Sequence, residues 1–245
     1  MRKGVEQTLK AVSITDVGKC RGHNEDSVFA ISSGGSAIAL VADGMGGHQA
    51  GEVASSMAIE LIKKELTKKE DIEDLIGLMK KAYINANSEI YNYAKENQKV
   101  MGMGTTLVSA VVTDGKLIVA NVGDSRAYEI KGRKINQITK DHSYVQSLID
   151  SGMITKEQAM NHPKKNYITR AMGTEESIKA DIFVKDYIGQ TVLLCSDGLS
   201  GLVTDKEILD IVLKSENTEA AAKALVLSAN EHGGTDNITV AIISR

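Results

Sequence analysis

Residues 37–44 read AIALVADG, and residues 191–198 read TVLLCSDG. Each is a short aliphatic run that ends in Asp-Gly, so we expect two buried strands. Each strand should deliver a carboxylate, Asp43 or Asp197, to the rim of a sheet, where the backbone turns sharply. Carboxylates directed to one point repel each other unless a cation joins them. The pattern therefore predicts a hard-metal site built on a sheet.

Composition places the chain among ordinary soluble globular proteins, with 245 residues, 42% hydrophobic and 25% charged. No uninterrupted apolar run approaches the ~18 residues that span a bilayer, and the first residues lack the apolar stretch of a secretory signal. The two cysteines, Cys20 and Cys195, are too few for a disulfide framework. We therefore expect a cytoplasmic protein with no membrane partner.

The distribution of charge limits the partners that the chain can bind, and the lack of linker-like segments limits the number of domains. The net charge is −3 and the basic residues form no long block, which disfavours nucleic acid as the main partner. Pro163 is the single proline, and no low-complexity stretch suggests a linker. We expect one domain over residues 1–245, working as a monomer.

Hydrophobic periodicity gives a coarse secondary structure. Asp114-Gly115 and Lys131-Gly132 are expected hairpin turns, and the residues 204–207 form a capping box. Helices are predicted over 50–64, 72–90, 208–213 and 219–231. Strands are predicted over 11–16, 27–31, 37–42, 107–113, 116–122, 127–130, 134–138, 191–196 and 237–244. Hairpins grouped apart from helices favour an α+β fold.

Residues 141–170 are polar and interrupt this pattern. They contain short helical pieces, one of which opens with a capping box in residues 155–158. We expect a surface excursion, and loops of that length tend to be functional.

Acidic residues recur at the predicted strand edges, beside glycine or another small residue. A tight turn alone explains any one of them, but not all of them together. Oxygen ligands without a cluster of His or Cys select Mg²⁺ or Mn²⁺ over Zn²⁺. Two such ions ~4 Å apart can share a water, lower its pKa and clamp phosphoryl oxygens. The five acidic places are Glu25-Asp26, Asp43, Asp124, Asp197 and Asp236.

Six motifs occur in order along the chain. They are RGHNED at 21–26, DGMGGH at 43–48, MGTT at 103–106, GDSR at 123–126, SDGL at 196–199 and GTDN at 234–237. With these motifs the chain resembles the metal-dependent serine/threonine phosphatases of the protein phosphatase 2C family, in their compact bacterial form. The resemblance runs from about Ser13 to Ile243.

The resemblance implies a fold and an activity. The fold is a four-layer α/β/β/α sandwich, with two central antiparallel sheets flanked by helix pairs and with residues 141–170 as the family's flap. The activity is Mg²⁺- or Mn²⁺-dependent hydrolysis of phosphoserine and phosphothreonine in proteins, by in-line attack of a metal-bridging hydroxide on phosphorus. A Ser/Thr kinase and its phosphorylated substrates are the implied partners. No protein nucleophile is needed, so Cys195 is expected to be inert, and Ser125 and Ser196 are expected to form local hydrogen bonds.

The resemblance also assigns roles in the centre of the site. Asp43 and Arg21 are the implied catalytic residues. Asp43 would bridge two metal ions, and the Gly44 carbonyl would ligate one of them. Asp197 and Asp236 would hold the first metal. Arg21 would bind the substrate phosphate, although an isolated arginine is usually a solvated surface residue.

Further roles follow at the edge of the site. Glu25 would reach the second metal through water, and Asp26 would orient metal-bound water. Asp124 resembles the residue that, with Asp197, holds a third metal in bacterial relatives.

The leaving-group acid and the substrate contacts remain open. Met45 stands where many eukaryotic members carry a histidine proposed as general acid. His48 and His23 are nearby candidates for the general acid, ranked after metal-bound water. Either histidine is also explained by a structural role. In the flap, the basic side chains either steer a phosphopeptide or are merely solvated; they are His142, Lys164, Lys165 and Arg170.

Other functional classes fit less well. A phosphoprotein reader without turnover would lack ligand carboxylates, and none is missing here. A metallohydrolase of nucleotides or small phosphate esters is the second alternative, but the sequence has no Walker-type loop to hold a nucleotide. A purely structural protein leaves the acidic residues unexplained.

Overall fold

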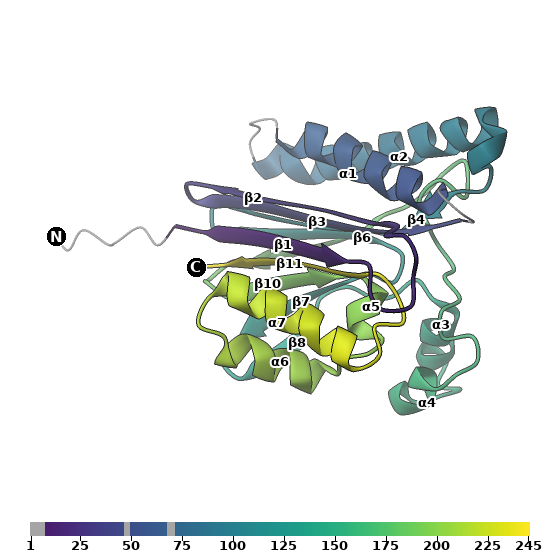
Figure 1. Ribbon diagram of the computed structural model, residues 1–245. Coiled ribbons are helices and arrows are strands. Elements are labelled where there is room, and N and C mark those ends of the chain that lie inside the picture. The colour runs from purple at the N-terminus through teal and green to yellow at the C-terminus, as the bar shows by residue number, and fades with distance from the viewer. Residues whose placement is uncertain (1–7, 47–49, 68–71) are drawn as a thin grey trace.

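The computed structural model describes residues 8–46, 50–67 and 72–245. Two antiparallel sheets lie face to face, and a helix pair covers the outer face of each (Figure 1). The predicted α/β/β/α sandwich, an α+β fold, is confirmed.

Two strands from the ends of the chain are neighbours in the first sheet. Its order is β1 (Lys10–Asp16), β11 (Ile238–Ser244), β10 (Thr191–Cys195), β7 (Arg126–Lys131) and β8 (Lys134–Gln137). The second sheet has the order β2 (Asp26–Ser33), β3 (Ser36–Met45), β5 (Leu107–Thr113), β6 (Lys116–Val122) and β9 (Asp181–Asp186), with β4 (Gly104–Thr105) paired to β3. This pairing brings the RGHNED segment, which follows β1, close to the GTDN segment, which precedes β11.

The predicted hairpins form as expected. Asp114 and Gly115 have φ of 45° and 72°, the left-handed pair that a two-residue hairpin turn requires. The β7–β8 hairpin pairs Lys131 with Lys134 around Gly132. These local turns set the register of β5 with β6 and of β7 with β8.

Alternation along β3 divides the core into layers. Ala39 and Val41 lie in the core between the two sheets, whereas Leu40 and Ala42 pack under the first helix pair. The same alternation in β10 places Leu194 between the sheets. Both strands are therefore buried on both faces, which is why they read as continuous aliphatic runs.

The helices cover the sheets as predicted, with longer bounds. Helices α1 (Ala50–Leu66) and α2 (Ile72–Glu96) lie on the second sheet, and α6 (Asp205–Lys214) and α7 (Thr218–Glu231) lie on the first (Figure 1). The capping box at Thr204 and Glu207 is confirmed and starts α6. Among the described residues, no helix is long and apolar enough to cross a membrane.

The expected flap stands apart from the layers at one end of the sandwich (Figure 1). It contains α3 (Tyr144–Asp150) and α4 (Lys156–Met160), and the capping box of Thr155 and Gln158 opens α4. Its two ends are joined, because the Thr169 backbone N–H donates to the His142 carbonyl at 2.8 Å. The flap is thus an excursion on a closed base.

Three features differ from the sequence pattern. Strand β9 is not predicted, because its apolar run is short and flanked by charged residues. The turn expected at Asp43-Gly44 is wrong, since β3 continues to Met45 and pairs with β4. At the second Asp-Gly the chain enters a short helix, α5 (Asp197–Ser200), rather than a tight turn. A 3₁₀ turn, η1 (Gln98–Val100), precedes β4.

Candidate active site

The acidic residues converge where the two sheets meet at one end. Asp26 lies directly opposite Asp43 in the antiparallel pair β2–β3. From the other sheet, Asp197 follows β10 at the start of α5, and Asp236 precedes β11. Asp124 lies in the turn between β6 and β7, which crosses from one sheet to the other.

Gly44 is required for close packing rather than for a turn. A Cβ built there would lie 2.2 Å from the Gly51 carbonyl oxygen in α1 and 2.5 Å from the Glu25 carbonyl oxygen. The Gly44 N–H also donates to the Glu25 carbonyl at 3.1 Å. Glycine at this position lets β3, α1 and the Glu25 segment meet beside Asp43.

The backbone of Asp43 is fixed by the MGTT segment. Its N–H donates to Thr106 Oγ1 at 3.0 Å, and its carbonyl accepts from the Thr106 N–H at 2.8 Å and from Thr105 Oγ1 at 2.9 Å. Thr106 Oγ1 in turn lies 2.7 Å from Ser125 Oγ. The local role predicted for Ser125 is confirmed, and the Asp43 side chain is left to face the other carboxylates.

Asp26 is only 7% exposed and is held by hydroxyl groups. Ser196 Oγ donates to Asp26 Oδ2 at 2.8 Å, as predicted for a local role of Ser196. Burial, together with the charges of Asp197 and Asp236, raises the pKa of Asp26 to about 7. The structure therefore contains a carboxyl whose ionised form is disfavoured, first by burial and then by neighbouring negative charge.

Four more carboxyl groups of the cluster also have raised pKa values. Burial and then the neighbouring acids raise the pKa of Asp43 well above its ordinary value. Burial and Asp197 raise the pKa of Asp124 to about 8. Burial and Asp236 raise the pKa of Asp197, against a hydrogen bond with the Asp43 carboxyl. For Glu25 the shift is also upward, mainly through burial.

Arg21 is the cation that the structure places at this cluster's edge. Its Nη2 donates to Asp236 Oδ2 at 2.8 Å, while 52% of the Arg21 side chain remains exposed. The hydrogen bond and charge of Asp236 raise the pKa of Arg21. The guanidinium is therefore anchored on one edge and accessible on the others.

Asn237, to which the sequence analysis assigned no role, ties the Arg21–Glu25 loop to the sheet. Its Oδ1 accepts from the Glu25 N–H at 2.8 Å, and its Nδ2 donates to the Val17 and His23 carbonyls at 2.9 Å each. A Cβ at Gly198 would lie 1.9 Å from the Asn237 carbonyl oxygen. The GTDN motif already contains Asn237, and its position beside Asp236 is the signal that could have identified it.

The donor set fits divalent cations. All five acidic places supply hard carboxylate oxygens, and Asp124 Oδ1 has no hydrogen-bond partner within the described part of the chain. In that same part, no three His, Cys, Asp or Glu side chains stand at the spacing of ligands around one ion. The fit rests on charge and donor type: buried like charges with raised pKa values are what a bound cation would relieve.

The basic flap residues have different surroundings. His142 is 8% exposed and Arg170 donates to Asp181 at 3.1 Å, so both tie down the flap base. His142 fits neither alternative that the sequence left open, because its ring is enclosed and so is neither solvated nor exposed to a substrate. Lys164 and Lys165 are exposed, so their substrate role remains a prediction. His48 lies outside the described residues.

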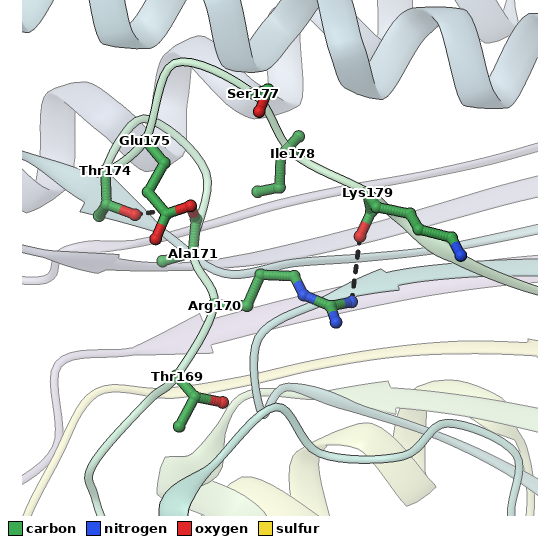
Figure 2. Close-up of a pocket in the computed structure, with 8 residues that line it drawn as sticks. All are labelled: Thr169, Arg170, Ala171, Thr174, Glu175, Ser177, Ile178 and Lys179. Carbon is green, nitrogen blue, oxygen red and sulfur yellow. Dashed lines mark hydrogen bonds between the residues drawn. The ribbon is translucent and has the colours of Figure 1, made fainter.

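A pocket of about 150 Å³ opens beside the flap base rather than at the carboxylates (Figure 2). Arg170 and Lys179 lie on one side, joined by a hydrogen bond from Arg170 Nη1 to the Lys179 carbonyl at 3.1 Å. Asn87 of α2 holds the adjoining loop through the Glu175 carbonyl and the Gly173 N–H. The lining of the pocket is mainly polar and does not include Asp43.

Cys195 confirms its predicted place in a strand. It lies fully buried in β10, and burial raises its pKa to about 12. A thiol with that pKa stays protonated near neutral pH and is a poor nucleophile.

A family model described as protein phosphatase 2C matches residues 21–229. The chain belongs to the protein phosphatase 2C family. It is accordingly a serine/threonine protein phosphatase, as the six motifs indicated. The matched span includes Arg21, Glu25, Asp43, Asp124 and Asp197 but ends before Asp236.

Relatives of this family resemble the chain over nearly its whole length. The serine/threonine phosphatase stp of Listeria monocytogenes is 42% identical over 237 residues, covering 94% of each sequence. The crystal structure of Stp1 from Staphylococcus aureus has a TM-score of 0.92 and 37% identity, and covers 97% of this chain and 95% of that one. The catalytic domain of PstP, solved in complex with two manganese ions, has a TM-score of 0.88 and 34% identity, covering 97% and 98%.

Proposed function

We propose that this protein phosphatase 2C member hydrolyses phosphoserine and phosphothreonine in proteins at the carboxylate cluster around Asp43, with Mn²⁺ or Mg²⁺ as cofactor. The observation that carries the proposal is the convergence of buried carboxyl groups from both sheets, with Asp26 opposite Asp43 and with Asp124 and Asp197 beside them. Burial, with the charges of neighbouring acids, raises the pKa of all four. Two bound ions, with a third as an option at Asp124, would supply an activated water and positive charge for the phosphoryl oxygens.

The residues of this chain have separate tasks in the proposal. Asp43, fixed through its backbone by Thr105 and Thr106, would hold both ions, and the Gly44 carbonyl would be a further ligand. Asp197 and Asp236 would hold one ion from the side of the first sheet. Supplying these ligands from two sheets keeps the reacting groups on rigid strands.

The residues at the edge of the site orient water and bind the substrate. Glu25 and Asp26 act on water beside the ions, with Asp26 held by the Ser196 hydroxyl at 2.8 Å. Arg21 binds the phosphate of the substrate, because 52% of its side chain remains exposed beside Asp236 and the guanidinium N–H groups match phosphoryl oxygens. No side-chain nucleophile is needed, which agrees with the buried Cys195.

An activity assay with paired variants tests the proposal. The protein with Mn²⁺ should release phosphate from a phosphothreonine peptide and lose this activity in excess chelator. Asp43→Asn should abolish turnover and keep the fold, while Asp186→Asn, an exposed carboxylate paired with Lys116, should leave turnover unchanged. Near-normal Mn²⁺-dependent activity of Asp43→Asn, or faster hydrolysis of nucleotides than of the peptide, would refute the proposal.

We further propose that the enzyme opposes a Ser/Thr kinase and that residues 1–245 act as one catalytic domain with residues 141–170 as flap. A pull-down with the Asp43→Asn variant should retain phosphorylated proteins, because binding persists without turnover. Retention that is unaffected by prior dephosphorylation of the lysate would contradict this.

A further inference from the structure

The start of the flap is joined to both sides of Asp124. On one side, His142 Nδ1 accepts from the Gly123 N–H at 3.0 Å, and the His142 N–H donates to the Gly123 carbonyl at 2.9 Å. On the other side, Asp141 accepts from Arg126 Nε at 3.0 Å and from Nη2 at 2.7 Å. Residues 141 and 142 therefore bracket the turn that carries Asp124.

This turn is packed directly against the support of Asp43. Gly123 has a φ of 106°, and a Cβ there would lie 2.5 Å from the Thr106 Cβ. Asp124 is 7% exposed and its Oδ1 lacks a partner in the part of the chain that the structure describes. A displacement of the turn would therefore move an unsatisfied buried carboxylate.

His142 also contacts the far end of the flap. Its Nε2 lies 2.9 Å from Arg170 Nη1 and 3.2 Å from Asp181 Oδ2. Because Nδ1 accepts the Gly123 N–H, a neutral ring carries its proton on Nε2, which then donates to Asp181 and does not accept from Arg170. Arg170, at the end of the flap, donates to the other oxygen of Asp181 at 3.1 Å. One imidazole thus connects the Asp124 turn with the closed base of the flap.

We propose that His142 is a positioning residue: Nδ1 fixes the Gly123–Asp124 turn so that the Asp124 carboxylate is held ready for a divalent cation, and Nε2 couples that carboxylate to the flap. The inference rests on the proposed role of Asp124 in metal binding. If His142 only stabilised the fold, its replacement would lower the stability of the protein without a selective effect on metal affinity.

Two substitutions separate the ring nitrogens. In His142→Asn, the amide oxygen can replace Nδ1 as acceptor for Gly123, whereas His142→Gln can reach toward Asp181 but loses the acceptor at Nδ1. We expect His142→Asn to lose less Mn²⁺ affinity than His142→Gln, because it keeps an acceptor for the Gly123 N–H and loses only the contact with Asp181. His142→Gln should weaken the Asp124-dependent Mn²⁺ site by about 10-fold to 100-fold, the usual cost of losing an outer support of a ligand. Isothermal titration with manganese alone measures this without turnover.

The same titration in an Asp124→Asn background tests whether the effect passes through Asp124. Asp124→Asn should itself weaken one Mn²⁺ site, and adding His142→Gln should then cause no further loss. Equal losses for the Asn and Gln variants, or a Gln effect that persists without Asp124, overturn the inference alone. A harmless Asp124→Asn overturns the inference together with the proposed role of Asp124.

A second variant serves if His142→Gln does not fold. Asp181→Ala removes the partner of Nε2 at a side chain that is 37% exposed. Hydrogen exchange of the flap amides should become faster, and Mn²⁺ affinity should fall in the same direction as for His142→Gln, again only when Asp124 is present. Unchanged exchange together with unchanged Mn²⁺ affinity overturns the coupling to the flap.

Discussion

Asp26→Asn should stabilise the metal-free protein, and only above about pH 5. Asp26 is 7% exposed, and its folded pKa rises from an ordinary value of 3.8 to about 7, mainly through burial. Between these values the folded protein keeps a proton that the unfolded chain releases. The contribution of Asp26 to the free energy of unfolding is therefore complete below pH 3.8 and is lost as the pH rises through 7.

The size of the stabilisation follows from the same rise in the pKa of Asp26. A change from 3.8 to about 7 in the pKa of Asp26 corresponds to about 4 kcal/mol at pH 8. Asparagine keeps an acceptor for the Ser196 hydroxyl but carries no charge, so it avoids this cost. We expect the gain in free energy of unfolding to be near zero at pH 4 and to reach a few kcal/mol at pH 8.

Urea unfolding in excess chelator at several pH values measures the difference. Asp186→Asn is the matched control, because Lys116 lowers the pKa of that exposed carboxyl and no gain at high pH is expected. With Mn²⁺ in excess, the sign should reverse, since a bound cation stabilises the ionised cluster. Parallel pH curves for the unmodified protein and Asp26→Asn in chelator would refute the reasoning.

Three further substitutions test other parts of the molecule. Arg21→Ala should raise KM for a phosphothreonine peptide more than it lowers kcat, because the guanidinium binds the phosphate; a loss mainly in kcat would contradict this. Gly44→Ala should cost more than about 3 kcal/mol in chemical unfolding, since its Cβ would meet the Gly51 carbonyl oxygen at 2.2 Å, and a loss under about 1 kcal/mol would be incompatible with that contact. Tyr83→Phe should cost about 1–2 kcal/mol, because its buried hydroxyl bonds Ser109 at 2.8 Å and the Ala120 carbonyl at 3.0 Å; unchanged stability would show that these bonds are worth nothing net.

The strands that carry the site could be predicted because their physics is local. The runs before Asp43 and Asp197 are buried on both faces, and glycine-containing turns bound the hairpins. Strand β9 could not be predicted, because as an edge strand it needs only one neighbour and its apolar run is confined to 182–184. The turn predicted at Gly44 was wrong for a similar reason. Glycine is required there because α1 packs against it, and that contact exists only in the folded chain.

The candidate site shows the same division between local and distant information. Carboxylates at the ends of predicted strands can be found in the sequence, and the motifs indicate the roles that these residues have in the family. The link between His142 and Gly123 joins residues 19 apart and depends on the intervening β7–β8 hairpin folding back. No local sequence pattern indicates that link. From the sequence alone, His142 is therefore interpreted as a basic residue on the surface of the flap.

Diffraction at the manganese absorption edge, from crystals grown with excess Mn²⁺, tests most directly whether these carboxylates serve one centre. Two anomalous peaks about 4 Å apart should flank the Asp43 carboxylate, with Asp197 and Asp236 bound to one of them. Crystals without an anomalous peak within bonding distance of Asp43 would contradict a catalytic metal centre at this end of the sheets.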